Sequence, residues 1–231
     1  MQITLPVSKD RAVEADGIEP LDNLEIDLRQ PLELLWKSIS QQRTSVRKSV
    51  REGVRVCWRH EPALLETQEL LLKDTYGRQG NGMRPNFPPT LYRHALAARQ
   101  SIGLRVLCAS YRGKLIGAVW ILADSEKCYY WDAATLHEAR ALNVNHLLVW
   151  VLIRWARRKG FKTLDLIGSS SGGRGGSRPG IGSFKQSMGG RSADYELVYW
   201  YSPLMRRALL AYRLFNRLRE QGIRKPKSTK S

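Results

Sequence analysis

The sequence predicts a mixed α/β fold, in which helices cover both faces of a mixed β-sheet, and three observations support this. Helical and strand-like segments are interspersed along the chain. Residues 104–134 hold three apolar strands in succession, and the turn Arg112-Gly113-Lys114 is short enough to join the first two as an antiparallel hairpin. The helical segment 141–159 is apolar on nearly every side and leads to a strand at 163–167, which is typical of a crossover connection.

The other elements follow from apolar periodicity and from breaker residues. Alternation predicts further strands at residues 24–28, 54–59 and 195–201. Helical spacing predicts helices at residues 31–52, 62–76, 90–100 and 181–188, and a final helix from 203 to about 220. Gly53 and Gly160 are expected to end helices, because glycine readily adopts the left-handed conformation found there.

Composition excludes several classes of protein. The chain has 231 residues, of which 42% are hydrophobic and 26% are charged, as in a soluble globular protein of one or two domains. Its three cysteines are scattered and form no CxxC motif, which argues against a zinc knuckle and favours a reducing compartment. The longest apolar run, Leu115 to Ala123, is about half of the ~18 residues that a membrane span needs. No signal peptide is apparent, so a cytoplasmic location is expected.

The net charge of +17 is unevenly distributed. Residues 1–30 carry three basic and seven acidic side chains, and we expect them to form an acidic arm or to be the remnant of a missing first half of a larger protein. Residues 31–202 are expected to form the main domain. Residues 203–231 carry nine basic side chains and one acidic one, and they predict a basic amphipathic helix with a disordered tail. This helix would either lie on an anionic membrane or pack on the domain. The overall charge favours nucleic acid or membrane partners, or serves solubility alone.

Several well-known motifs fail in this sequence. Residues 168–172 match the G-x-S-x-G of hydrolases, but a glycine-rich segment follows where a helix is needed, and no histidine occurs after His146. No segment fits a phosphate-binding loop. The four histidines have no metal-ligand spacing, so no metal site is expected.

One motif is met. The segment 180–190, GIGSFKQSMGG, resembles the G-[IL]-x-x-F-K-x-x-[FM]-G-G signature of the Fem-type aminoacyltransferases, which are peptidoglycan-bridge enzymes of the GNAT-like superfamily. Three more segments resemble motifs of that family in the same order. They are RTSVRKSVREGV at 43–54, YYWDAA at 129–134, and NHLLVW at 145–150 with LDLIGS at 164–169. The resemblance covers about residues 31–202 and implies a GNAT-like acyltransferase fold.

Two departures from the family bear on the function. Fem-type proteins contain two GNAT-like halves, and this chain resembles only the second. GNAT enzymes that use acyl-coenzyme A hold its pyrophosphate on a glycine-containing turn before the long buried helix, whereas residues 135–142 contain no glycine. The resemblance therefore implies aminoacyl-tRNA as the acyl donor, with acyl-coenzyme A as the alternative and no tightly bound cofactor.

The resemblance also assigns candidate catalytic residues. Lys185 of the F-K pair would stabilise the oxyanion that forms during acyl transfer; the alternative is a solvated lysine on a short helix. The lysine is expected to be exposed, so that alanine could replace it and leave the fold intact. Phe184 would shape the pocket or belong to the core. Asp165, on a buried strand, is either a base or orienting group, or a carboxylate satisfied by loop amides.

Two further groups are candidates for substrate binding. Tyr130 and Trp131 lie on a central strand, where they would stack on a sugar or simply pack in the core. Arg43 and Arg47, four residues apart on a helix and next to Lys48, would hold a phosphate or form a solvated basic face.

The sequence therefore predicts an acyltransferase that moves an aminoacyl or acyl group onto an amine of a cell-envelope sugar or peptide precursor. One alternative is an acetyl-coenzyme A-dependent N-acetyltransferase. The other is an inactive basic module that binds RNA or a membrane surface. For the enzyme, the hypothesis is that residues 203–231 bring it to the inner face of the membrane.

Overall fold

The computed structural model describes residues 2–6, 15–78, 88–168, 179–200 and 202–203. The chain divides into a larger unit, residues 22–193, and a smaller unit that combines residues 1–21 with 194–231. The predicted C-terminal helix, and the glycine-rich residues 169–178, lie outside the described residues. Among the described helices, none is long and apolar enough to cross a bilayer.

The smaller unit contains a pair of strands that the sequence analysis did not predict in full. Strand β1 (Gln2–Pro6) runs antiparallel to β8 (Arg191–Tyr199), with Gln2 opposite Tyr199 and Pro6 opposite Tyr195. The first residues of β2 (Gly17–Asp27) also belong to this unit. Part of the segment 1–30, which was expected to form an arm, therefore belongs to β-strands.

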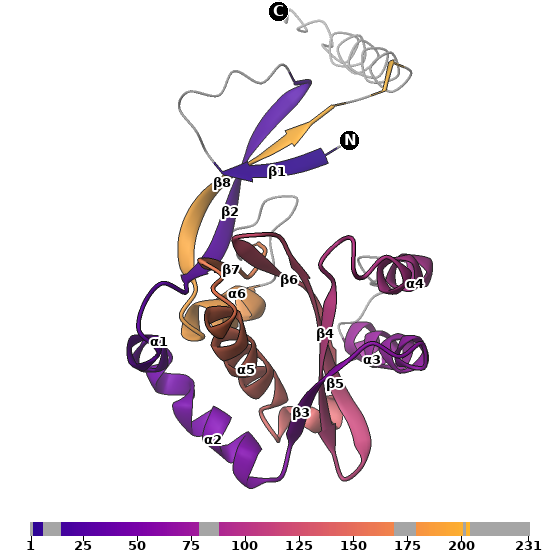
Figure 1. Cartoon of the computed structure of the whole chain (residues 1–231), viewed down its shortest axis with the longest axis vertical. Coiled ribbons are helices and arrows are strands. Elements are labelled where there is room, and N and C mark those ends of the chain that lie inside the picture. The colour runs from indigo at the N-terminus through magenta and orange to yellow at the C-terminus, as the bar shows by residue number, and fades with distance from the viewer. Residues whose placement is uncertain (1, 7–14, 79–87, 169–178, 201, 204–231) are drawn as a thin grey trace, which may run out of the picture. The chain divides into compact units, whose positions relative to one another are not determined.

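The larger unit is built on a mixed sheet (Figure 1). Its strands follow the order β2-β7-β6-β5-β4-β3, and all neighbours are antiparallel except β6 and β7, which are parallel. The bounds are β3 (Arg55–Arg59), β4 (Arg105–Tyr111), β5 (Lys114–Ala123), β6 (Lys127–Thr135) and β7 (Thr163–Asp165). Arg112 and Gly113 both have positive φ angles, as the expected two-residue hairpin turn requires. The predicted mixed sheet is therefore confirmed.

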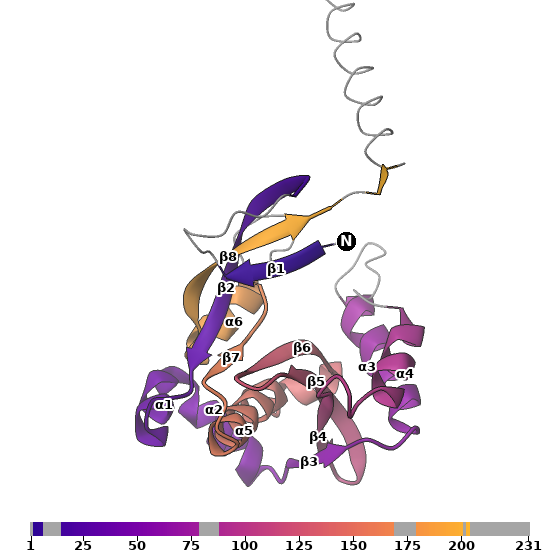
Figure 2. The same cartoon turned by 45° about the horizontal axis from the view of Figure 1, so that its top comes forward.

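Helices cover both faces of this sheet, as predicted (Figures 1 and 2). Val119 and Ile121 of β5 belong to one core, whereas Ala118 and Trp120 belong to the other, because successive side chains of a strand point to opposite faces. The first core is covered by α1 (Leu32–Ser38), α2 (Arg43–Arg51), α5 (Val144–Arg158) and α6 (Pro179–Ser187). The second is covered by α3 (Leu64–Arg78) and α4 (Pro89–Ala97). Short 3₁₀ turns occupy Ser40–Gln42 and His137–Arg140.

Helix α5 is the central helix of the first core. Leu148 and Leu152 have no exposed surface, and the Trp150 ring packs 4.6 Å from that of Trp36 on α1. Its first turn lies against β5 at Gly117, where an added Cβ atom would come within 2.8 Å of Thr135 and 3.2 Å of Val144. Glycine at this position lets the amino-terminal end of α5 approach the sheet closely.

Candidate active site

The sheet opens between its two parallel strands. Strands β6 and β7 pair only from Lys127 opposite Thr163 to Tyr129 opposite Asp165. Beyond that point β7 ends, while β6 continues to Thr135. The carboxyl ends of parallel strands are where ligands commonly bind in α/β proteins, because helix and loop ends converge there.

The turn that follows β7 has an unusual backbone. Ile167 and Gly168 have φ angles of +51° and +71°, and a β-branched residue rarely adopts such a conformation. Two side chains hold this turn in place. Asp165 Oδ1 accepts hydrogen bonds from Ile167 N at 2.7 Å and from Asn23 Nδ2 at 2.8 Å. Asn23 Oδ1 in turn accepts one from Gly168 N at 2.7 Å.

Lys185 reaches this turn from α6. Its side chain is buried, with 7% of the residue's surface exposed, and Nζ donates to the carbonyl oxygens of Ile167 and of Gly168, the latter at 3.2 Å. An ammonium group has three N–H donors, so one is left for a ligand. Burial lowers the pKa of Lys185 to about 8, although the nearby charge of Asp165 opposes this shift. The expectation of an exposed lysine is wrong, because the side chain is buried and hydrogen-bonded.

The signature sequence explains how α6 presents this lysine. Phe184 and Met188, one helical turn apart, pack into the core beneath α5. Gly189 has a φ angle of +93°, and Gly190 N donates to Lys185 O at 3.0 Å, which ends the helix. A Cβ atom on Gly190 would lie 2.8 Å from that same carbonyl oxygen, so the Gly-Gly pair permits the tight stop.

The first turn of α5 lies next to α6. The His146 ring meets the Phe184 ring edge to face, with centroids 5.1 Å apart. Among the residues that the structure describes, His146 Nδ1 and Asn145 Oδ1 are buried and have no hydrogen-bond partner. Burial lowers the pKa of His146, although the Asn143 backbone opposes this, so its imidazole is mostly neutral at pH 7. Buried polar atoms are nearly always hydrogen-bonded, so two orphans on one turn indicate a place for a ligand or water. The sequence analysis quoted both residues within a motif but gave them no role.

The other predicted site residues are dispersed. Tyr130 packs against the core under α5, whereas the Trp131 ring lies on the opposite face, 5.6 Å from Tyr92 and 6.3 Å from Trp120. These two aromatic residues therefore cannot form one stacking surface.

The predicted basic group lies on α2. The Arg47 guanidinium stands over the Trp36 ring at 5.6 Å, and Arg43 Nε donates to Ser40 O at 3.4 Å. Among the described residues, no hydrogen bond or ion pair joins Arg43, Arg47 or Lys48 to Lys185, and phosphate binding by them stays a prediction.

The sequence analysis missed a second buried carboxylate. Asp132 Oδ2 on β6 accepts hydrogen bonds from the Tyr92 hydroxyl at 2.6 Å and from Gln68 Nε2 at 3.4 Å. Burial raises the pKa of Asp132, and the Tyr92 hydroxyl partly offsets this. Within the described parts of the chain, Gln68 Oε1 and Trp120 Nε1 are buried and have no hydrogen-bond partner. The available signal was an aspartate in an otherwise apolar and aromatic strand.

Comparison with known proteins finds a matching family model and solved structures with a similar fold. A family model described as an acetyltransferase (GNAT) domain matches residues 37–178, which is more than half of the chain. The crystal structure of FemX superposes with a TM-score of 0.67 at 14% identity, over 88% of this chain and 66% of that one. The C-terminal domain of a putative lysylphosphatidylglycerol synthetase from Agrobacterium fabrum gives a TM-score of 0.59 at 13% identity, over 84% of this chain and 65% of that one.

These likenesses to solved structures concern the fold. The chain spans just under two thirds of the length of FemX and of the Agrobacterium fabrum domain. No curated protein matches the sequence.

Proposed function

Because this chain belongs to the acetyltransferase (GNAT) domain family, we propose that it transfers an acyl group to an amine and that Lys185 stabilises the reacting carbonyl. The observation that carries this proposal is the buried Lys185 ammonium, fixed by two backbone carbonyls at the point where β6 and β7 separate. With a pKa of about 8, this group is mostly charged at neutral pH.

The chemistry is proposed for Lys185 together with the first turn of α5, whose His146 ring contacts Phe184, the neighbour of Lys185 in the sequence. When an amine attacks the acyl carbonyl, the carbonyl oxygen becomes an anion, and a fixed cation lowers the energy of that state. The third N–H of Lys185 supplies the hydrogen bond. The attacking amine must lose a proton, and we propose the neutral His146 imidazole to receive it, since its Nδ1 has no hydrogen-bond partner among the described residues. The anionic intermediate then collapses: the new C–N bond stays, the bond from the acyl carbon to the donor breaks, and the imidazolium returns its proton to the departing oxygen of an ester donor or sulfur of a thioester donor. Asp165 acts as a positioning residue, because its hydrogen bonds hold the turn whose carbonyls orient Lys185.

We propose an aminoacyl group as the cargo and an amine of a cell-envelope sugar or peptide precursor as the acceptor. Two observations support a donor other than coenzyme A. The connection from β6 to α5 runs through a 3₁₀ turn without a glycine, and the fold resembles FemX. The second candidate, an N-acetyltransferase that uses acetyl-coenzyme A, is favoured by the description of the matching family model.

Transfer assays with acetyl-coenzyme A and with aminoacyl-tRNA, each against a panel of amine acceptors, separate the two donors. Calorimetry that finds micromolar affinity for acetyl-coenzyme A, about −8 kcal/mol, would reverse our order of the candidates. Absence of transfer with every donor, together with salt-dependent polyanion binding, would instead favour the inactive basic module.

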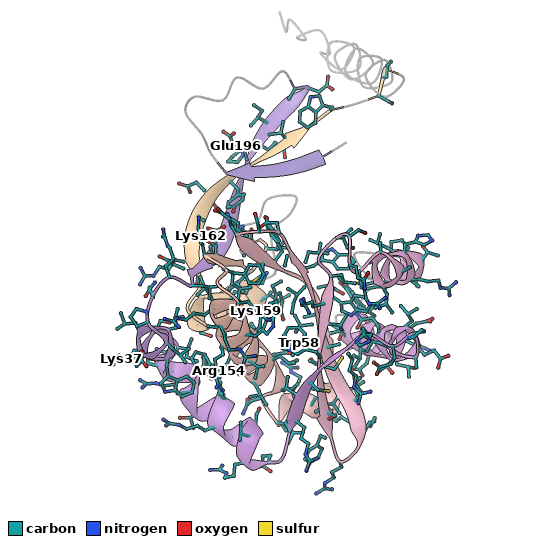
Figure 3. The ribbon with its side chains drawn as sticks, viewed as in Figure 1. Lys37, Trp58, Arg154, Lys159, Lys162 and Glu196 are labelled. Carbon is teal, nitrogen blue, oxygen red and sulfur yellow. The ribbon has the colours of Figure 1, made fainter. Side chains whose placement is uncertain are left out.

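The test of Lys185 needs a variant that keeps the bulk of the buried side chain. Lys185→Met removes the charge, and we expect it to lower transfer by roughly 10²–10³, the usual loss when an oxyanion donor is removed. Lys159→Met, at an exposed lysine just after α5, is the matched control (Figure 3). Thermal unfolding must show that both variants are folded. Normal turnover by a folded Lys185→Met protein would contradict the proposal.

A further inference from the structure

Two of the three cysteines lie directly opposite each other in the sheet. Strands β3 and β4 pair antiparallel over five residue pairs with no shift of register, and in the middle pair Cys57 is the partner of Cys108. Directly opposite residues of antiparallel strands have Cα atoms about 4.5 or 5.5 Å apart, depending on the type of pair. Disulfides join Cα atoms that are about 4.4–6.8 Å apart, so either type of pair allows the bond.

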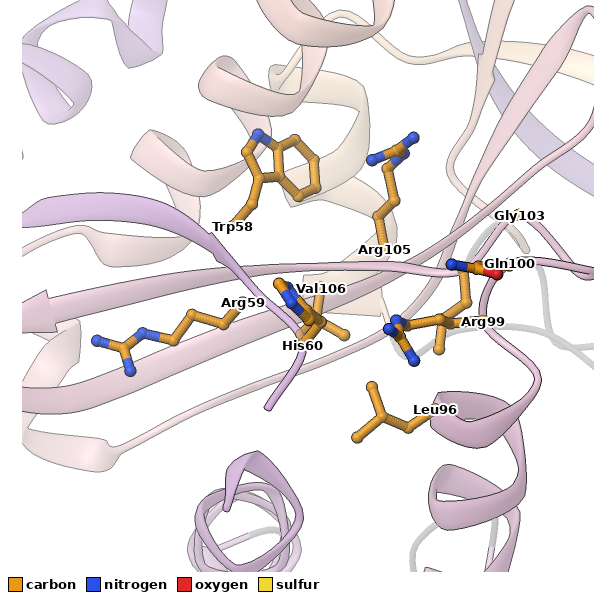
Figure 4. A pocket seen from close by; sticks show the side chains of 10 residues that line it. Trp58, Arg59, His60, Leu96, Arg99, Gln100, Gly103, Arg105 and Val106 are labelled. Carbon is orange, nitrogen blue, oxygen red and sulfur yellow. The ribbon is translucent and has the colours of Figure 1, made fainter. Parts of the chain in front are cut away.

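Both thiol side chains lie on the same face of the sheet. Trp58 of β3 lies on the face covered by α5, where its ring packs 4.7 Å from that of Trp155. Val106 of β4 belongs to the core under α3 and α4, and Figure 4 shows Trp58 and Val106 on opposite sides of the strands. Because side chains alternate along a strand, Cys57, next to Trp58, and Cys108, two residues after Val106, both point to the α4 face.

The two thiols differ in their access to solvent. Cys57 is exposed on β3, which is an edge strand of the described sheet. Cys108 is 1% exposed, and burial raises its pKa to about 12, with a further contribution from the nearby Cys57 sulfur. An oxidant that arrives from solvent therefore meets Cys57 first. Cys108 is then the neighbouring sulfur that can attack the oxidised Cys57.

The third cysteine provides an internal comparison. Cys128 on β6 has no exposed surface and belongs to the core under α5, on the other face of the sheet from Cys108. Its partners in register are Ala123 on β5 and Leu164 on β7. A buried thiol with no cysteine opposite it in the sheet is expected to stay reduced.

We propose that Cys57 and Cys108 form a reversible disulfide when the protein meets hydrogen peroxide, and that this bond ties the edge strand β3 to β4. Bonds of this kind in proteins of reducing compartments are usually transient and respond to the redox state. The inference does not rest on the proposed acyl transfer, because it uses no residue of the Lys185 site.

The reaction takes two steps. The Cys57 sulfur attacks one oxygen of the peroxide: an S–O bond forms, the O–O bond breaks, and the other oxygen leaves as water with the thiol proton. Cys57 is thereby oxidised to a sulfenic acid and the peroxide is reduced. The Cys108 sulfur then attacks the sulfenic sulfur: the S–S bond forms, the S–O bond breaks, and the hydroxyl group leaves as water with the Cys108 proton. Two thiols and one peroxide thus give one disulfide and two waters.

Thiol counting on the full chain tests the proposal. The reduced protein is treated with hydrogen peroxide at low protein concentration, denatured and alkylated. We expect the number of free thiols to fall from three to one, and peptide mapping to find Cys57 joined to Cys108. Dithiothreitol should restore all three thiols. The proposal is overturned if three thiols remain, if the bond includes Cys128, or if a non-reducing gel shows two chains linked to each other instead.

Three variants assign the steps, and thermal unfolding of the reduced proteins must show that each is folded. Cys57→Ser should keep both of its remaining thiols. Cys108→Ala should stop at the sulfenic acid of Cys57, which dimedone labels. The matched control is Cys128→Ala, which should form the bond as the unmodified protein does. Loss of the bond in this control, or a full set of reactions in Cys57→Ser, would contradict the assignment of the two sulfurs.

The bond should also change the stability of the fold. Helices α3 and α4 lie between the two cysteines in the sequence, and joining the ends of this long segment restricts the unfolded chain. We expect oxidation to raise the midpoint of thermal unfolding by about 5 °C or more, and dithiothreitol to reverse the shift. Cys57→Ser, treated with peroxide in the same way, should show no rise. An unchanged midpoint in the oxidised unmodified protein would mean that the bond does not tie β3 to β4.

Discussion

Two buried carboxylates in the larger unit have the same burial but different surroundings. Asp165 is 3% exposed and Asp132 is 8% exposed, and burial raises the pKa of both. Asp165 receives an amide and a backbone N–H, and it lies near the buried cation Lys185. Asp132 accepts a phenol hydroxyl, a side-chain amide and the Ala133 backbone N–H among aromatic rings, and two polar atoms beside it have no partner among the described residues.

The difference teaches what each carboxylate does for the fold. Asp165 holds a backbone turn, and that turn in turn orients Lys185, so its role depends on being a hydrogen-bond acceptor. Asp132 instead accepts from two side chains and from the backbone of the next residue, Ala133, within strand β6, so no turn depends on it. We therefore expect substitutions at Asp165 to affect both the stability of the fold and the Lys185 ammonium. Substitutions at Asp132 should affect neither strongly.

The largest expected effect is that of Asp165→Ala on stability. It leaves the buried Asn23 amide and the Ile167 N–H without an acceptor, and each unsatisfied buried donor costs roughly 1–3 kcal/mol. We expect the free energy of unfolding to fall by about 2–4 kcal/mol in denaturant titrations. The control is Asp124→Ala, since Asp124 accepts two backbone N–H groups, both at 2.7 Å, and the Tyr129 hydroxyl at 2.8 Å, but in an exposed turn where water can replace it. Equal losses in the two variants would contradict this account.

The next effect concerns pH. In the proposed mechanism transfer needs the charged form of Lys185, so activity should fall about tenfold for each pH unit above a pKa of about 8. Stability should change in the opposite direction. The pKa of the folded state lies below the ordinary value near 10.4, so the contribution of this group to stability rises between pH 8 and about 10.

Variants at the two carboxylates sharpen this prediction. Asp165→Asn keeps the Oδ1 acceptor but removes the charge that raises the pKa of Lys185, so the alkaline fall in activity should begin at a lower pH. Asp132→Asn should leave that pH unchanged. Lys185→Arg should show no such fall, because arginine stays protonated. A pH–rate profile that is flat to pH 10 in the unmodified protein would refute the role of the ammonium.

A smaller effect is expected at the strained turn. Ile167 has a positive φ angle and 41% exposure, so its side chain contributes little burial while its backbone is held in a costly conformation. Such strain costs of order 1–3 kcal/mol, and glycine would relieve it but lose entropy. We expect Ile167→Gly to raise the free energy of unfolding by about 1 kcal/mol. Ile167→Val, which stays β-branched, should not. If the glycine variant is the less stable of the two, the turn is not strained.

The two regions also show how far sequence reasoning reaches. Periodicity and turn chemistry predicted the mixed sheet, its hairpin and the helix α5, because these depend on local spacing. The motif located Lys185 and Asp165 correctly on α6 and β7 but missed the burial of the lysine. The Lys185 ammonium is buried against two backbone carbonyl groups that lie 17 and 18 residues earlier in the sequence. Asn23 and Tyr92 were missed altogether, because their partners lie 142 and 40 residues away in the sequence.

The smallest effect is that of Asp132→Asn. The asparagine oxygen can still accept the Tyr92 hydroxyl, and its amide can donate to Gln68 Oε1, which has no partner in the unmodified protein. The raised pKa of Asp132 means that its contribution to stability is present at low pH and is lost as the pH rises through the folded-state value. The neutral amide avoids that loss. We therefore expect the variant to equal the unmodified protein in stability in acid and to match or exceed its stability at pH 7, by no more than about 0.5 kcal/mol.

Denaturant titrations of Asp132→Asn at pH 4 and pH 7 measure this, with Tyr92→Phe as the companion variant that removes the hydroxyl. A loss of more than 1 kcal/mol at pH 7 would show that the charge of Asp132 itself is needed, and the contrast between the two carboxylates would fail.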